Sequence, residues 1–509
     1  MRSQSASAAT PLVRSCSFAA VCWTVGVVQL GLISTTAVAG DAKPQPKLVG
    51  SASCAAAACH GGLTGRKVVG AEFPVWAARD PHARAYSVLL NDLSKQMAAR
   101  LKLSNQTAHE SAECLSCHSP ATAAAKAATN TEHPPLAGVD CESCHGAAEY
   151  WLTPHKWPNW KKRSVAEKSD LGFADLSDVL TRAKLCTKCH VGGKGRDVNH
   201  ELIAAGHPRL FFELSTFHNN WPKHWPRKLD EEKHAVPATQ PDAPTSGGSL
   251  FEAKLWAVGQ VVTAQSSLEL LSQRAAPGHA WPEFAEWNCF ACHHDLQSPN
   301  DLQSPNDLQS PSTWQSSAPQ QRPRDSFGWN AWPYAMLEPL ASLPHSPNRN
   351  GPNRNGPDRN DPALLIPQFL KLRSQFTQAL PNAKCIADDA DAAAKSLQTW
   401  AEQLNEPESA RVLLSPASLT ALRQSLVTKA QPEFVAREWD STTQLFLSIV
   451  AVRYAERAAR NLAPVDEASE RLIDDRLKTL QEQVNFPTKY RSPHQSEPRH
   501  VGSQPSTSP

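Results

Sequence analysis

The sequence predicts a mainly α-helical protein with little β structure, and three observations support this fold class. Apolar residues recur at helical spacing over residues 250–274 and again from residue 367 to about residue 486. Alternating patterns of β-branched and polar residues, which would indicate strands, are scarce. The 509 residues include 41 prolines, and only 40% are hydrophobic. Aliphatic packing alone is therefore sparse, and we expect a second stabilising component.

The composition divides the chain into five segments, since its length exceeds what one compact core usually takes up. Residues 1–39 are interpreted as a secretory signal peptide, because Arg2 and Arg14 accompany an apolar stretch that ends in an Ala-Val-Ala cleavage site. An uncleaved anchor is the alternative, and it would leave the protein membrane-associated. The other segments are a motif-bearing domain (40–295), a linker (296–362), a helical domain (363–490) and a disordered tail (491–509).

Low-complexity sequence defines the linker. The hexapeptide Asp-Leu-Gln-Ser-Pro-Asn begins at Asp295, repeats at Asp301 and starts again at Asp307. A second run rich in Pro, Asn and Arg covers residues 346–362, and neither run can bury a core. An aromatic patch, Phe327 to Tyr334, lies between the two runs and is expected to dock on a folded domain. Residues 250–274 are interpreted as an amphipathic helix that packs against the motif-bearing domain.

The cysteines carry the strongest signal in the chain. Two of the 13 cysteines fall in the signal segment, and ten of the other eleven form five pairs, each followed directly by a histidine. Four motifs have the form Cys-x-x-Cys-His, in which two thiols bind the vinyl groups of one porphyrin and the adjacent imidazole binds its iron. These motifs are Cys114/Cys117/His118, Cys141/Cys144/His145, Cys186/Cys189/His190 and Cys289/Cys292/His293.

The first motif in the chain is wider than the other four. Four residues separate Cys54 from Cys59, and His60 follows directly. We expect a haem here as well, because the histidine is in place and the sequence offers these cysteines no other partner. The sequence therefore predicts five covalently bound haem c groups, four at regular motifs and a fifth at the widened one.

Three other uses of paired cysteines explain the pattern less well. A structural zinc site requires four ligands per metal but no histidine after every second cysteine. A disulfide framework suits an exported chain, yet it leaves the five histidines unexplained. Thioredoxin-like redox chemistry requires a βαβ unit, which the pattern does not contain. Cys385, outside every motif, is interpreted as a free thiol.

The charge balance gives no indication of a nucleic-acid partner. Without residues 1–39, which contain two arginines and no acidic residue, the chain has 49 basic and 49 acidic side chains. The short run Lys161-Lys162-Arg163 is interpreted as a solvated patch. Ionised haem propionates would make the loaded protein mildly acidic.

Strings around the motifs resemble the cytochrome c-554 type of multihaem cytochrome family. They are Val-Gly-Ser-x-x-Cys at 49–54, Trp-x-x-Arg-Asp-Pro-His-Ala-Arg-Ala-Tyr at 76–86, the segment from Gly138 to Gly146 with Trp151 and His155 downstream, and Gly-His-Pro-Arg-Leu at 206–210. The resemblance covers about residues 48–295. It implies a largely helical fold with closely stacked haem pairs and electron transfer in nitrogen-cycle respiration. The family type has four haems, whereas this chain has five motifs, one of them widened.

The resemblance also implies sixth ligands for the irons. Fourteen histidines remain beyond the five proximal ones, and His82, His155 and His207 match family ligand segments. His200 is a further candidate, because its seven-residue separation from His207 places both on one helical face. Other histidines are His109 and His279, which are also considered as ligands, His294, which directly follows a proximal ligand, and His218, His224 and His234, for which structural roles are expected.

The sequence favours a non-enzymatic electron carrier, exported to the periplasm or another extracytoplasmic space, that works between a redox protein donor and a redox protein acceptor. Two imidazoles saturate a haem iron and suit electron transfer. An oxidoreductase acting on a small nitrogen or sulfur compound at a five-coordinate haem is the alternative. A third interpretation makes residues 363–490 a docking module, since no catalytic signature is present there.

Overall fold

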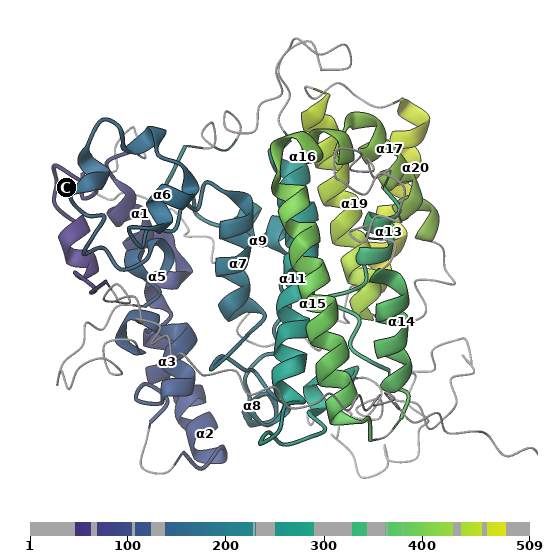
Figure 1. Cartoon of the computed structure of the whole chain (residues 1–509), viewed down its shortest axis with the longest axis horizontal. Coiled ribbons are helices and arrows are strands. Elements are labelled where there is room, and N and C mark those ends of the chain that lie inside the picture. The colour runs from purple at the N-terminus through teal and green to yellow at the C-terminus, as the bar shows by residue number, and fades with distance from the viewer. Residues whose placement is uncertain are drawn as a thin grey trace, which may run out of the picture. The chain divides into compact units, whose positions relative to one another are not determined.

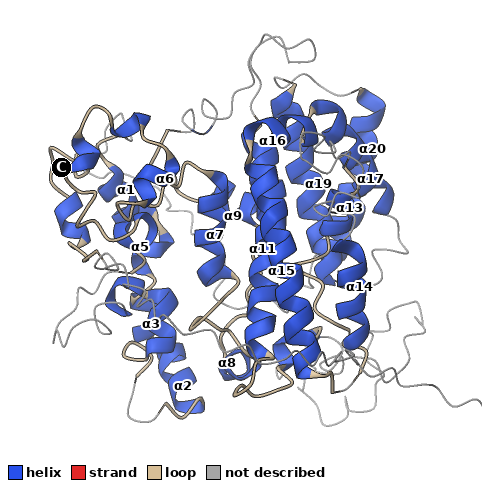
Figure 2. Cartoon of the chain, in the orientation of Figure 1, coloured by secondary structure: helices blue, strands red, loops and turns tan. Residues whose placement is uncertain are grey.

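The structure of the protein is a computed structural model. It describes residues 46–62, 69–103, 107–123, 138–226, 230, 250–289, 328–343, 362, 365–378, 380–430, 439–460 and 466–484. Within these ranges the fold is helical without any strand (Figure 2), and only two isolated β-bridges occur, Gly193 with Arg196 and Trp287 with Trp329. The predicted fold class is therefore confirmed. The signal segment, the hexapeptide repeats and the tail lie outside the described residues.

The motif-bearing part consists of short helices connected by turns. Its α-helices are α1 (Glu72–Arg79), α2 (Asp92–Arg100), α3 (Ala112–His118), α5 (Cys141–His145), α6 (Val165–Ser169), α7 (Val179–His190), α8 (His200–Ala205) and α9 (Leu214–Asn220). Its 3₁₀ turns are η1 (Ser51–Cys54), η2 (Pro81–Arg84), η3 (Ser87–Leu90), η4 (Pro154–Lys156) and η5 (Trp160–Lys162). Helices α3, α5 and α7 each end on the histidine of a motif, so the thiols and the imidazole share the last turns of one helix.

Local capping fixes where the motif helices begin. The Asp140 carboxylate accepts a hydrogen bond from the Ser143 amide (2.9 Å) at the start of α5. Asp178 accepts one from the Thr181 amide (2.8 Å) at the start of α7. Such caps satisfy backbone donors that the first helical turn leaves open. Gly146 ends α5 with a φ of +84°, and a Cβ there would lie 2.1 Å from the Gly172 carbonyl oxygen, so this turn requires glycine.

Helix α11 (Phe251–Arg274) differs from the expected amphipathic helix, because it is buried on nearly all sides. It packs against α7, α15 (Ala383–Asn405) and α19 (Trp439–Ala459). Its polar side chains have buried partners that replace water. Lys254 donates to the Asn405 carbonyl oxygen (2.7 Å), and the Trp256 indole donates to Ser448 Oγ (3.2 Å). Because these polar side chains have hydrogen-bond partners, they can be buried, and the polar face of the helix is not exposed as its sequence pattern predicted.

The C-terminal helices share one hydrophobic core with α11. They are α13 (Leu337–Ala341), α14 (Leu365–Gln375), α15, α16 (Pro407–Leu413), α17 (Pro416–Lys429), α19 and α20 (Glu467–Val484). The core is continuous from Val179 to Leu480, and α11 and α15 run side by side in Figure 1. The linker predicted over residues 296–362 stays a prediction. Helix α11 precedes this linker in sequence, yet it packs mainly against helices that come after the linker.

The aromatic patch docks on this core, as expected, in its described residues. The Trp332 indole donates to the Phe212 carbonyl oxygen (3.1 Å), and the Trp329 ring stacks on Phe376 with centroids 5.2 Å apart. By contrast, the second hydrophobic cluster, in the motif-bearing part, contains only Leu89, Ala98, Ala108 and Leu115 as buried members. Among the described helices, none is both long and apolar enough to cross a membrane.

Candidate haem sites

Four of the five proximal histidines each lie opposite a second histidine. The ring centroids are 6.2 Å apart for His60 and His155, 6.4 Å for His118 and His207, 6.5 Å for His145 and His224, and 6.0 Å for His190 and His82. Two imidazoles bound to opposite sides of one metal at about 2 Å place their centroids about 6 to 6.5 Å apart. The spacing in all four pairs therefore fits a haem iron held between two imidazoles.

Hydrogen bonds to Nδ1 orient five of these eight rings. The acceptors are Glu72 Oε2 for His60 (3.0 Å), Asp80 Oδ1 for His82 (2.9 Å) and the carbonyl oxygens of Ala85 for His118 (2.9 Å), Leu152 for His155 (2.5 Å) and Pro208 for His207 (2.8 Å). Each acceptor requires a proton on Nδ1, a tautomer assigned from the hydrogen-bond network. Nε2 is then left bare, as a metal ligand must be.

The buried histidines are held in the neutral form that binds a metal. Burial lowers the pKa of His145 to about 4 and that of His190 to about 4. Burial also lowers the pKa of His224. Nδ1 of both His145 and His224 is buried without a hydrogen-bond partner among the described residues. This pair therefore lacks, within the described residues, the Nδ1 acceptors that orient five of the other rings, and burial keeps both imidazoles neutral.

Thiol contacts show which motifs are neighbours. The Cys141 thiol donates to the Cys54 sulfur, which lowers the pKa of Cys54 to about 7. The Cys189 thiol contacts Cys117 in the same way. Burial, followed by the nearby Cys186, raises the pKa of Cys144 to about 12. The first motif thus lies beside the third, the second beside the fourth, and the third beside the fourth, which fits the paired haems implied by the family resemblance.

The fifth motif is described only at Cys289, because Cys292 and His293 lie outside the described residues. Arg209 Nη1 lies 3.7 Å from Cys289 Sγ. The His200 amide donates to Glu283 Oε1 (2.8 Å), and the His200 ring lies 5.7 Å from the Phe284 ring. The structure therefore places His200 beside the segment that leads into the fifth motif, and its role as a ligand stays a prediction.

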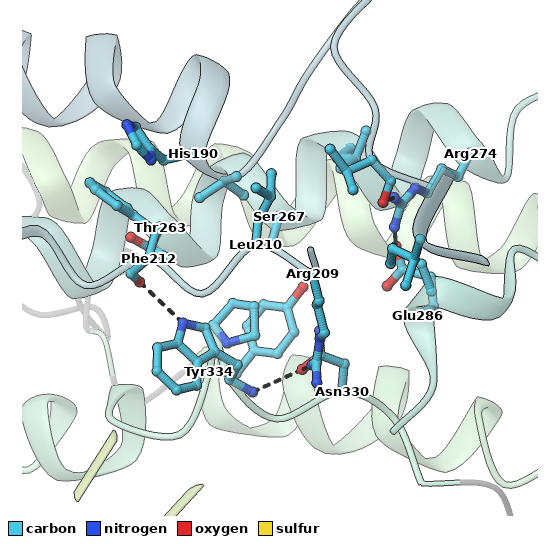
Figure 3. Close-up of a pocket in the computed structure, with 17 residues that line it drawn as sticks. His190, Arg209, Leu210, Phe212, Thr263, Ser267, Arg274, Glu286, Asn330 and Tyr334 are labelled. Carbon is cyan, nitrogen blue, oxygen red and sulfur yellow. Dashed lines mark hydrogen bonds and ion pairs between the residues drawn. The ribbon is translucent and has the colours of Figure 1, made fainter. Parts of the chain in front are cut away.

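A cavity of about 70 Å³ lies between His190 and this segment. Figure 3 shows Arg209, Arg274, Glu286, Asn330 and Tyr334 around it. Arg274 donates to Glu286 Oε1 (2.6 Å) and also pairs with Asp197, while Arg209 donates to Asp440 Oδ2 (2.8 Å) and Asn330 Oδ1 (2.6 Å). Burial raises the pKa of Glu286 and that of Tyr334. Two guanidinium groups thus face three carboxylates, and the cavity offers no excess positive charge for an anion.

The remaining histidines have other surroundings. His109 contacts Thr107 Oγ1 (2.7 Å) and the Tyr86 ring. His218 is buried, contacts Arg182 Nη1 through Nε2 (2.8 Å) and lies 3.7 Å from Asp230, and its pKa is lowered to about 3, mainly by burial. His279 is exposed, and His234 and His294 lie outside the described residues. Within the described residues, none of these three described histidines faces a proximal ligand.

His224 is the residue that the sequence analysis missed. A structural role was expected because it lies in a Trp- and Pro-rich stretch, but its ring faces His145, and the Trp221 and Trp225 rings pack against it. The number of distal histidines, compared with the number of motifs, could have indicated it. His82, His155 and His207 can complete three irons and His200 a fourth, so five motifs leave one proximal histidine without a partner.

Replacing Glu72 with glutamine should raise the reduction potential of one haem. The carboxylate accepts a hydrogen bond from His60 Nδ1 and makes that imidazole more electron-rich, which stabilises the ferric iron. We expect a rise on the order of 50 mV, equivalent to roughly a tenfold change in a one-electron equilibrium. A spectroelectrochemical titration measures it. The control is Glu149→Gln, an exposed acid that accepts from the Lys47 amide. Unchanged potentials in Glu72→Gln would contradict the orientation of His60.

One comparison with known proteins found a family match for part of the chain. Residues 53–146 match the family model of cytochrome c554 and c-prime. No curated protein and no solved structure matches the chain. The matched segment contains the first three motifs, including the widened one, and extends to His145 and Gly146. Proteins of this family are c-type cytochromes of electron transfer that bind haem c covalently, and they are typically extracytoplasmic. Residues 53–146 are therefore similar to the cytochrome c554 and c-prime family.

Proposed function

We propose that the protein is a periplasmic, or otherwise extracytoplasmic, carrier that passes electrons between a redox protein donor and a redox protein acceptor through five covalently bound haems. The single observation that carries the proposal is the set of four paired histidines. A haem held by two imidazoles has no open position, so it exchanges electrons and binds no substrate.

The residues around each pair support this role. Bound haem supplies a one-electron couple at each iron. The paired imidazoles keep the same ligands in both oxidation states, and their Nδ1 acceptors fix the ring orientation. Nδ1 of His145 and of His224 is buried, which limits the access of water to that side of both rings. The ten attachment cysteines, of which Cys292 lies outside the described residues, position the groups, and their contacts give the neighbour order first, third, fourth and second motif.

Ligand-binding spectroscopy tests the proposal. The purified, reduced protein should show no change in its absorption spectrum under carbon monoxide at four haems, and the oxidised protein should give low-spin electron paramagnetic resonance signals. Intact mass should correspond to the chain with five haems. Carbon monoxide binding at two or more haems, or dominant high-spin signals, would contradict the carrier function.

The alternative, an oxidoreductase acting on a small nitrogen or sulfur compound, depends on the fifth motif. The polar cavity beside Cys289 favours it, since such chemistry needs proton donors near an open iron. An oxidoreductase of this kind would bind carbon monoxide at one haem. A Cys289→Ala/Cys292→Ala variant would lose that binding. A matched Cys114→Ala/Cys117→Ala variant, which removes a paired site, should leave that binding intact.

A further inference from the structure

We propose that a basic patch, Lys156, Lys161, Lys162 and Arg163, is the docking site for an acidic redox protein that exchanges electrons at the first motif. The inference rests on the proposed function, because a docking site for electron exchange requires an electron carrier. It replaces the interpretation of these residues as a merely solvated run.

The charge in this patch is concentrated in a short segment, and Glu167, which interacts with Arg163, is the acidic residue that follows it. Residues 153–163 contain four basic side chains and no acidic one, although the chain as a whole is close to balanced. Lys156, Lys161 and Lys162 are all exposed. The next lysine, Lys168, is by contrast buried and paired with Asp175 (2.5 Å). A local positive surface of this kind attracts an acidic partner over distances of about one Debye length, roughly 10 Å at 0.1 M salt.

The patch is built directly onto the first haem site. Turn η4 contains both His155, which faces His60, and Lys156. The Trp160 ring of η5 lies 6.4 Å from the His155 ring, and the Arg163 guanidinium lies 5.9 Å from the Trp160 centroid. Two further ring contacts hold the segment in place, Trp151 with His155 (5.6 Å) and Trp160 with Phe173 (5.2 Å).

The first site is also open to solvent. The His60 side chain is 42% exposed, whereas Nδ1 of His145 is buried. Cys59 is the exposed cysteine among those described, and the others are partly buried. Trp157, between the lysines, is 49% exposed. An exposed aromatic residue within a polar rim is typical of protein interfaces. Electrons can therefore enter or leave here over a short path, and an acidic partner is the one that the patch recognises.

A charge-reversal variant tests the inference. The variant is Lys156→Glu/Lys161→Glu/Lys162→Glu in the full, haem-loaded protein, and the probe is a reduced plant-type [2Fe–2S] ferredoxin of strongly negative net charge. We expect its second-order rate of haem reduction, at low ionic strength, to fall about 10-fold to 100-fold. The dependence of the rate on salt should weaken as well, because the attraction is screened.

The matched control has the same change in net charge at another surface. It is Lys371→Glu/Lys384→Glu/Lys395→Glu, on α14 and α15, where the three lysines are 62%, 83% and 73% exposed. Its rate should change by less than about threefold. An equal loss in both variants, or no loss in the patch variant, would overturn the inference.

Two further measurements separate this inference from the proposed function. Dithionite should reduce all haems in the native protein and in both variants, which shows that the haems remain intact. Carbon monoxide should leave the four paired sites unchanged. If both hold and the ferredoxin rates are equal, the docking site fails while the carrier function stands. If carbon monoxide binds to the paired sites, the carrier function itself fails.

Discussion

Replacing His224 with methionine should raise the reduction potential of one haem by on the order of 100 mV, within the span of about 0.8 V that axial ligands provide. His224 faces His145 with a centroid distance of 6.5 Å. A thioether is a weaker donor than an imidazole and stabilises the ferrous state, so His/Met ligation has a higher potential than two imidazoles. A spectroelectrochemical titration should resolve one haem that moves while the others change little.

The control for this prediction is His218→Met, in the same Trp- and Pro-rich stretch. His218 is also buried, but it contacts Arg182 and lies near Asp230 instead of facing a proximal ligand. Its loss removes the acceptor of Arg182 Nη1, although Arg182 keeps Asp230 and the Leu176 carbonyl oxygen. The variant should therefore lose about 1–3 kcal/mol of stability while every potential stays in place. Equal potentials in His224→Met and the native protein would show that His224 does not bind iron.

The contrast between these two histidines shows what the sequence can predict about the sites. Proximal ligands are encoded locally, because each follows its cysteines directly, and the four that the structure describes end a helix or a turn. Distal ligands depend on where the chain returns in space. His82 and His207 were inferred from family strings, and the structure brings each to a proximal ring. His224 has no such string, and only the tertiary fold places it 79 positions from His145 in sequence yet opposite its ring.

The fold has a similar division between local and long-range information. The helical type of residues 250–274 and of most of the segment from residue 367 followed from apolar spacing. The burial of α11 did not, because residues such as Lys254 and Gln260 look solvent-exposed in a helical pattern. Lys254 is buried against the Asn405 carbonyl, 151 positions away, and Gln260 lies beside Glu213. The spacing of apolar residues predicts which face of a helix is apolar. Whether the opposite face is also buried depends on contacts with helices that are distant in sequence.

Deleting residues 363–509 should prevent the protein from accumulating as a soluble, haem-loaded chain. Helix α11 packs against α15 and α19, and Leu255, Trp256, Val258, Val262 and Leu268 are fully buried in the shared core. Exposing these five side chains would cost about 8–15 kcal/mol. This cost is comparable with the whole stability of a typical domain, about 5–15 kcal/mol. Haem content per soluble polypeptide, measured by the pyridine haemochrome spectrum, checks the prediction.

The control is a chain that ends at residue 484, which keeps every described helix. It should accumulate and bind haem like the native protein. The opposite result for the larger deletion, a soluble protein with all haem spectra intact, would support residues 363–490 as a separate docking module. The shared core argues against that outcome. The Arg209–Asp440 ion pair connects α19 to Arg209, which lines the cavity and lies 3.7 Å from Cys289 Sγ, so removing the C-terminal helices takes a buried partner from Arg209.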